Sequence, residues 1–133
     1  MASELKVDKF TGVTTAGSID VVGEGNSTTT NLQQGLAKAW LRFQGTSTAQ
    51  IKDSHNVASL TDNGTGDYDY NFTNNMASIN YSATANGQDT TRRDGVHQSL
   101  EGQATTDVQI QHYENNAVVD CARLLSTTHG DLA

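Results

Sequence analysis

The chain is 133 residues long, enough for one compact domain, and it carries a formal net charge of −7. Only 35% of its residues are hydrophobic and 17% are charged, whereas Thr, Ser, Asn, Gly and Gln are abundant. Such a composition is typical of exposed β-structure that shares part of its core with neighbouring subunits. The negative charge disfavours phosphate-bearing partners, so neither nucleic acid nor a membrane surface is expected as a partner.

The opening residues, MASELKVDKF, lack the apolar core of a signal peptide, and no apolar run approaches the ~20 residues of a membrane-spanning helix. The chain is therefore expected to stay in the compartment where it is made. Cys121 is the only cysteine, which excludes an internal disulfide bond and a cysteine-based zinc site. We expect no cofactor.

Residues 1–31 alternate short apolar pairs with small polar residues and end in GEGNSTTTN. They are predicted to form an extended N-terminal arm that becomes ordered on whatever it docks against, with brief strands near 5–7 and 19–21. The residues predicted to anchor the arm are apolar: Leu5, Val7 and Phe10.

The predicted domain, 32–133, begins with LQQGLAKAWLRFQ, whose apolar spacing permits either a helix or a strand. We expect a strand over 37–44, because aromatic residues favour strands and Gly35 would interrupt a helix. Trp40 lies between two apolar neighbours and is predicted to anchor the core, although its ring could instead stack on a sugar.

Beyond this strand, apolar and polar residues alternate in short runs separated by Asn, Gly and Asp. The clearest run, DYDYNF at 67–72, has an aromatic face and a polar face. A hairpin turn is expected at 114–116, and the last apolar strand is expected over 118–125. These strands predict an all-β fold, a small antiparallel β-sandwich or roll. Its predicted core contains the aromatic residues Trp40, Phe43, Tyr68, Tyr70 and Phe72.

The stretch SLTDNGTGDYDYNF, with its acids and glycines, is the most site-like part of the chain. An EF-hand loop starting at Asp62 would need side-chain oxygens where Gly64 and Gly66 stand, so the calcium motif fails. Asp67 and Asp69 could form a catalytic carboxylate pair, but a solvated strand face is the simpler interpretation. No catalytic residue is therefore predicted.

Turn chemistry explains the same stretch better. Asp62, Asn63 and Gly64 suit a tight hairpin, and Gly66 permits a bulge where the next strand begins. These residues are predicted to form a structural turn, in which Asn63 and Gly64 adopt a positive φ.

The stretch 85–106 shows the least pattern and is predicted to be a long exposed loop. Because loops tolerate variation, contacts with a host or partner are expected there. The basic cluster in this loop could bind a phosphate or a carboxylate, or form a salt bridge with a neighbouring subunit. The candidate contact residues are Thr91, Arg92, Arg93, Asp94 and His97.

The histidines are scattered through the chain at His55, His97, His112 and His129. No two of them have the spacing of a metal-binding pair. A three-fold oligomer could gather one histidine from each chain around a metal ion, but solvent-facing histidines are the simpler expectation. We predict no metal site.

The run from 35 to 83 resembles a small β-domain of tail-fibre and other tail proteins of bacteriophages, often from marine and cyanobacterial viruses. The opening LKVD also looks like the start of such virion fibre proteins. The resemblance is carried by KAW at 38–40, GT at 45–46, DS at 53–54, NV at 56–57, TDNGTGDY at 61–68, NF at 71–72 and Met76.

This resemblance implies a non-enzymatic phage virion protein of the short tail-fibre or tail-tip type, with 1–31 as the virion anchor. Its partners would be other virion proteins and a host-surface glycan or protein, and its location the virion, on the tail. The low apolar content and the resemblance together suggest a homotrimer. Related domains usually follow a long shaft, whereas here only about 30 residues precede the domain. A capsid or neck decoration protein, of the cement or head-fibre type, is therefore the alternative.

Overall fold

The structure is a computed structural model, and it describes residues 4–13, 19–22, 28–88, 96–114 and 116–133. Within 96–101 only the backbone is described. The chain divides into two compact units, residues 1–36 and 37–133, a boundary five residues after the predicted one at 31/32. Within the described ranges, no helix combines the length and the apolar character that a membrane crossing requires.

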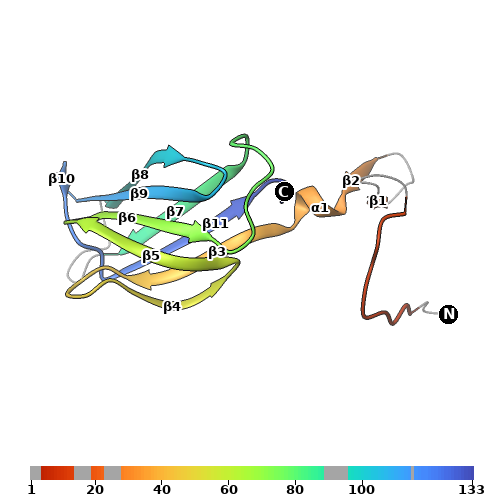
Figure 1. Cartoon of the computed structure of the whole chain (residues 1–133), viewed down its shortest axis with the longest axis horizontal. Coiled ribbons are helices and arrows are strands. Elements are labelled where there is room, and N and C mark those ends of the chain that lie inside the picture. The colour runs from red at the N-terminus through yellow and green to blue at the C-terminus, as the bar shows by residue number, and fades with distance from the viewer. Residues whose placement is uncertain (1–3, 14–18, 23–27, 89–95, 115) are drawn as a thin grey trace. The chain divides into compact units, whose positions relative to one another are not determined.

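The first unit contains a two-stranded antiparallel ribbon and one short helix (Figure 1). β1 (Asp20–Val22) pairs with β2 (Thr29–Asn31), and α1 (Leu32–Gly35) follows directly. The helix begins here because the side chain of Asn31 accepts a hydrogen bond of 3.1 Å from a backbone N–H of its first turn. Residues 4–13 form no strand, so of the two brief strands predicted in the arm only the second, β1, is present.

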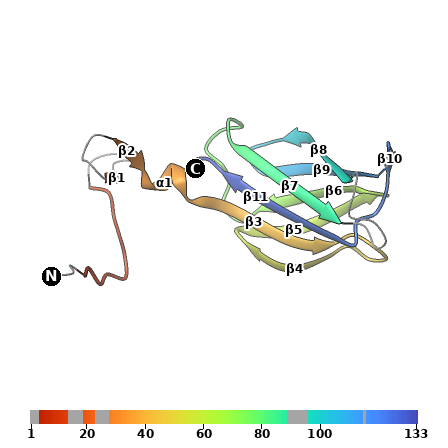
Figure 2. The same cartoon turned by 180° about the vertical axis from the view of Figure 1, so that it is seen from behind.

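The second unit is an all-β antiparallel sandwich, as predicted, and Figures 1 and 2 show it from opposite sides. One sheet contains β3 (Ala37–Gln44), β4 (Gln50–His55), β7 (Ser82–Gln88) and β11 (Arg123–His129). The other contains β5 (Val57–Gly64), β6 (Asp67–Phe72), β8 (Val96–Gln103), β9 (Asp107–Glu114) and β10 (Ala117–Val118). The strand orders are β4-β3-β11-β7, called the β3 sheet, and β10-β9-β6-β5 with β8 also paired to β9, called the β6 sheet.

A single residue, Asn56, carries the chain from the β3 sheet to the β6 sheet. It stands between β4 and β5 with a φ of 55°, a left-handed conformation that asparagine tolerates better than most residues. The backbone N–H of Asn74 donates to Asn56 Oδ1 at 2.7 Å, and Asn56 Nδ2 donates to the Asn74 carbonyl at 3.0 Å. The corner therefore joins the edge strand β4 of one sheet to the edge strand β5 of the other. Its hydrogen bonds to Asn74 hold it against the segment that follows β6.

The core lies between the two sheets, because alternate residues of each strand point inward. Phe43, Tyr68, Tyr70 and Phe72 are buried, as predicted. Phe43 and Tyr68 meet across the sheets with ring centroids 4.9 Å apart. Trp40 is 37% exposed, so the prediction that it anchors the core is wrong. The strand alternation explains this, since both neighbours of Trp40 in β3 are buried and the indole must point outward.

The last strand, β11, begins at Arg123, so the predicted strand over 118–125 is placed too early. Two polar side chains of β11, Ser126 and Thr128, are buried. The hydroxyl oxygen of Tyr70 lies 3.0 Å from Ser126 Oγ and 3.0 Å from Thr128 Oγ1. Hydroxyl groups from both sheets thus form hydrogen bonds with one another inside the core. Because two inward residues of β11 are polar, an apolar pattern alone could not reveal the full extent of this strand.

Most of the stretch 85–106 is strand, so the prediction of a long loop is wrong. β7 continues to Gln88, where it pairs with β11, and β8 begins at Val96, where it pairs with β9. His97 therefore belongs to a strand, and its backbone pairs with Tyr113. Four predicted contact residues lie outside the described residues: Thr91, Arg92, Arg93 and Asp94.

The hairpin predicted in the acid- and glycine-rich stretch joins β5 to β6, but its turn lies later, at Thr65 and Gly66. Gly64 and Gly66 have φ values of +138° and +66°, whereas Asn63 does not adopt a positive φ as predicted. The bulge lies in β5, between Asp62 and Gly64. Asp62 Oδ1 accepts a hydrogen bond of 3.1 Å from Gly64 N and so supports the bulge.

Candidate functional site

The outer surface of the β3 sheet carries exposed apolar side chains at its centre. Trp40 on β3 is 37% exposed, and Leu125 on β11 is 45% exposed. In the strand register Trp40 pairs with Thr127, and Arg42 pairs with Leu125. These outward side chains are cross-strand or same-face neighbours of one another. We call the group formed by Trp40, Arg42, Leu125 and Thr127 the Trp40 face.

Polar side chains flank the Trp40 face on both edge strands. On the β4 side the next outward residues are Asp53 and His55, and on the β7 side they are Thr84 and Asn86. All of them are exposed. The indole of Trp40, with an apolar ring and one N–H donor, is therefore surrounded by groups that can form hydrogen bonds.

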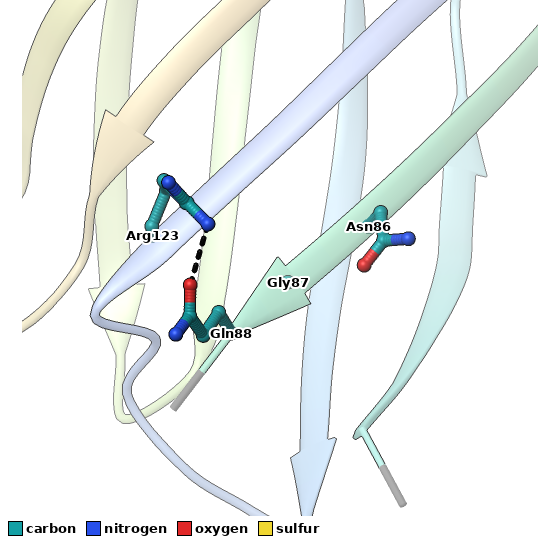
Figure 3. A pocket seen from close by; sticks show the side chains of 4 residues that line it. All are labelled: Asn86, Gly87, Gln88 and Arg123. Atoms are coloured by element: carbon teal, nitrogen blue, oxygen red, sulfur yellow. Dashed lines mark hydrogen bonds between the residues drawn. The ribbon is translucent and has the colours of Figure 1, made fainter. Parts of the chain in front are cut away.

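A depression with a volume of about 550 Å³ adjoins the Trp40 face where β7 ends and β11 begins (Figure 3). It is lined by Asn86, Gly87, Gln88 and Arg123. A guanidinium N–H of Arg123 donates to Gln88 Oε1, as the dashed line in Figure 3 shows. Because Asn86 pairs with Leu125, the depression and the Trp40 face share a border. Amide groups and a guanidinium suit a polar ligand with both donors and acceptors.

The outer surface of the β6 sheet is acidic, and some of its side chains form hydrogen bonds with one another. Asp67 accepts hydrogen bonds from Gln109 Nε2 at 2.9 Å and from Gln111 Nε2 at 3.3 Å. Oδ1 of Asp69 is buried and has no hydrogen-bond partner within the described part of the chain. Both carboxylates are half-buried, so the expectation of a fully solvated strand face is wrong. We call Asp67, Asp69 and Asp107 the Asp67 face.

A partly buried polar contact joins the β5–β6 turn to the segment before β11. Gly66 N donates to Asp120 Oδ1 at 2.8 Å, and the hydroxyl of Tyr68 donates to the same oxygen at 3.0 Å. The Tyr68 ring lies where a side chain at Gly45 would stand, since an added Cβ there would be 2.1 Å from the hydroxyl oxygen. Burial raises the pKa of the Cys121 thiol to about 11 and also raises the pKa of Tyr68. These groups serve the fold.

His112 is fully buried, which corrects the expectation that the histidines face solvent. Its Nδ1 lies 2.9 Å from the carbonyl oxygen of Val119, an arrangement that favours a proton on Nδ1. Its Nε2 has no hydrogen-bond partner among the described atoms. His55 and His129 are exposed, and the side chain of His97 is outside the described residues.

The predicted anchoring residues are exposed in a segment that forms neither helix nor strand. Leu5 is 75% exposed, Val7 47% and Phe10 61%. Within the ranges that the structure describes, no three His, Cys, Asp or Glu side chains are grouped so that they could hold a metal ion.

Sequence reasoning missed Arg42, Leu125, Asn86 and Arg123 as surface partners of Trp40. The signal for Arg42 was present, because a strand over 37–44 with alternating apolar residues must point every second residue outward. The other partners depend on the pairing of β11 and β7, which no local pattern reveals.

Comparisons with protein-family models, with curated proteins and with solved structures found no match to this chain. The fold alone defines its class: a small antiparallel all-β sandwich whose sheet surface combines an exposed indole, two arginines and amide groups.

Proposed function

We propose that the chain is a non-enzymatic structural protein of a bacteriophage virion, of the short tail-fibre or tail-tip type. Its N-terminal arm anchors it to other virion proteins on the tail. Its sandwich attaches to a glycan or protein of the host surface through the Trp40 face and the adjoining depression.

The residues that resemble phage tail proteins hold structurally demanding positions, which supports a shared fold. Gly45 leaves room for the Tyr68 ring, Asn56 forms the corner between the sheets, and Gly66 forms the hairpin turn with φ of +66°. Trp40 belongs to the same motif, and it lies outside the buried core with 37% of its surface exposed. A binding role for the indole accounts for it.

The observation that carries the anchoring role is a run of exposed apolar side chains near the N-terminus. Leu5, Val7, Phe10 and Val13 are 75%, 47%, 61% and 97% exposed. Exposed apolar surface is unfavourable in water unless another surface covers it. A neighbouring virion protein with an apolar groove would cover these side chains.

Substitution within the arm tests the anchoring role. Replacing Leu5, Val7 and Phe10 together with serine should yield particles that lack the protein, whereas Lys9→Ser in the same segment should be incorporated normally. Quantitative mass spectrometry of purified particles measures incorporation. A triple variant that is incorporated like the wild type would overturn this role.

The same exposed segment favours a second candidate, a capsid or neck decoration protein of the cement or head-fibre type. Decoration predicts a high copy number, fragile particles when the protein is missing, and unchanged adsorption to the host. Tail attachment predicts a low copy number and competition between purified protein and phage for host cells. Copy number per particle, measured together with adsorption, separates the two.

The homotrimer is supported by apolar side chains that one sandwich leaves exposed away from the Trp40 face. Ile79 is 58% exposed, Leu132 42% and Val118 37%. Association of three copies could cover them. Sedimentation of the purified chain tests this, and a folded monomer at micromolar concentration would contradict it.

A further inference from the structure

Charge is divided between the two sheets of the sandwich. Three exposed basic residues and one exposed acidic residue lie on the strands of the β3 sheet: Arg42, Lys52, Arg123 and Asp53. The strands of the β6 sheet contain no lysine or arginine, and its outer surface carries the acidic Asp67 face. Although the whole chain has a net charge of −7, the β3 sheet is therefore locally basic.

Two arginines stand on the outer surface of the β3 sheet beside exposed apolar groups. Arg42 pairs with Leu125, and Arg123 precedes Leu125 on the same face of β11, so the arginines are diagonal neighbours. Such positions are about 7 Å apart in an antiparallel pair, within reach of one ligand. Among the described residues neither arginine forms an ion pair, and Arg123 donates one hydrogen bond to Gln88. Because a guanidinium has five N–H donors, both can bind an anion.

We propose that the Trp40 face and the adjoining depression bind an acidic saccharide, one that carries carboxylate or sulfate groups. The indole of Trp40 stacks on the C–H face of a sugar ring. Thr127 and Asn86 exchange hydrogen bonds with sugar hydroxyls, and Arg42 and Arg123 bind the anionic substituents with charge-assisted hydrogen bonds. This names the ligand class of the proposed attachment site and rests on the proposed function only for its biological setting.

Other anionic occupants fit this surface less well. The Asp67 face of a second copy offers carboxylates, but Asp67 already accepts hydrogen bonds from Gln109 and Gln111, and the unpartnered Oδ1 of Asp69 is buried. A flat sheet would also leave the depression at Gln88 and Arg123 unfilled. An acidic peptide supplies charge but lacks the hydroxyl groups that the amides and threonines of this surface can bind.

Binding can be measured on the purified full chain with oligogalacturonate and, as a matched neutral ligand, its methyl ester. Trp40 is the only tryptophan, so a change in intrinsic fluorescence reports binding at this face directly. We expect oligogalacturonate to bind at least about tenfold more tightly than the ester, and to bind more weakly as salt is added. Equal affinity for the two ligands, or no binding of either at millimolar concentration, would overturn the proposal.

Variants locate the contact by calorimetry. Arg42→Gln and Arg123→Gln should each weaken oligogalacturonate binding about tenfold and leave binding of the ester unchanged. Lys9→Gln, which changes the net charge equally but lies outside the sandwich, should bind like the wild type. Trp40→Ala should weaken the binding of both ligands. Ile79→Ala removes exposed apolar surface elsewhere and should leave both affinities unchanged. Thermal unfolding must show that each variant is folded.

Two further results would exclude this ligand class. Polyglutamate that binds as tightly as oligogalacturonate would mean that the face recognises charge alone. A loss of subunit association in Trp40→Ala, measured by sedimentation, would mean that the face is an intersubunit contact. If the protein competes for host adsorption but does not bind oligogalacturonate, the saccharide inference fails while the attachment function stands.

Discussion

The hydroxyl of Tyr68 donates a hydrogen bond of 3.0 Å to Asp120 Oδ1, across a sequence separation of 52 residues. The same oxygen accepts the backbone N–H of Gly66 at 2.8 Å. One carboxylate thus holds both a side chain of β6 and the turn that precedes it. This contact explains how a short segment without strand structure is fixed at the end of the sandwich.

Tyr68→Phe should lower the free energy of unfolding by about 1.5–3 kcal/mol, because it removes a partly buried hydrogen bond to a charged group. Tyr113→Phe is the matched control: its hydroxyl donates to Gln111 on a half-buried surface, and its loss should change stability by less than about 0.5 kcal/mol. Urea unfolding of both variants checks this. Equal stability of the two variants would mean that Asp120 is satisfied without Tyr68.

Gly66→Ala should destabilise the protein more than Gly64→Ala. Both glycines have a positive φ, so each substitution strains the backbone by about 1–3 kcal/mol. At Gly66 the new Cβ would also lie 2.5 Å from the carbonyl oxygen of Val119, whereas at Gly64 it would meet nothing within 4 Å. A smaller loss at Gly66 in urea unfolding would contradict the close approach of the two segments.

Tyr70→Phe should cost about 1–3 kcal/mol, because Thr128 Oγ1 loses its hydrogen-bond partner inside the core. Ser126 keeps a second contact, since its hydroxyl donates to the Thr84 carbonyl at 3.1 Å. Adding Thr128→Val to Tyr70→Phe should restore part of the stability, because the one hydroxyl that Tyr70→Phe leaves unsatisfied is then gone. A double-mutant cycle measures the coupling, and strictly additive losses would show that the two hydroxyls do not interact.

Local sequence patterns were sufficient to predict a strand whose inward residues are apolar. They were insufficient for a strand whose inward residues are polar. The alternation along 37–44 predicted β3 correctly, because Leu41 and Phe43 are large and buried. β11 was placed too early, because Ser126 and Thr128 occupy inward positions that normally hold apolar residues. β7 has the sequence SATANGQ and becomes a strand through its pairing with β11, which is tertiary information.

Prediction of the candidate site from local sequence patterns was limited in the same way. The presence of Trp40 in a strand was predictable, and its exposure followed from the alternation that the strand imposes. Its grouping with Leu125, Asn86 and Arg123 was not predictable, because it requires the register of three strands that are distant in sequence. The loop hypothesis drew attention to Arg92 and Arg93 instead, since unpatterned sequence had been equated with a loop.

Stability should begin to fall as the pH approaches 9 and should continue to fall as the pH rises through about 11. In the unfolded chain the Cys121 thiol releases its proton near its usual pKa of 9.0, whereas burial raises its folded pKa to about 11. Between these values the folded state binds more protons, so stability falls with rising pH. Burial also raises the pKa of Tyr70 and Tyr81, so the loss of folding stability extends to higher pH.

Cys121→Ala separates the thiol from the tyrosines. Urea unfolding under reducing conditions, repeated at intervals from pH 7 to about 11, should show a shallower decline between pH 9 and 11 in this variant than in the wild type. Parallel curves would mean that the thiol does not contribute, and a rise in stability over this range would contradict the sign of the effect.

The one-residue corner at Asn56 has a mechanical consequence. Since β4 and β5 are joined through it without slack, they behave as one bent strand, and the sheets cannot slide past each other along that side. β7 and β8 lie side by side at the opposite side of the sandwich. The Asn56 corner therefore couples the two sheets through the backbone along the β4–β5 side of the sandwich.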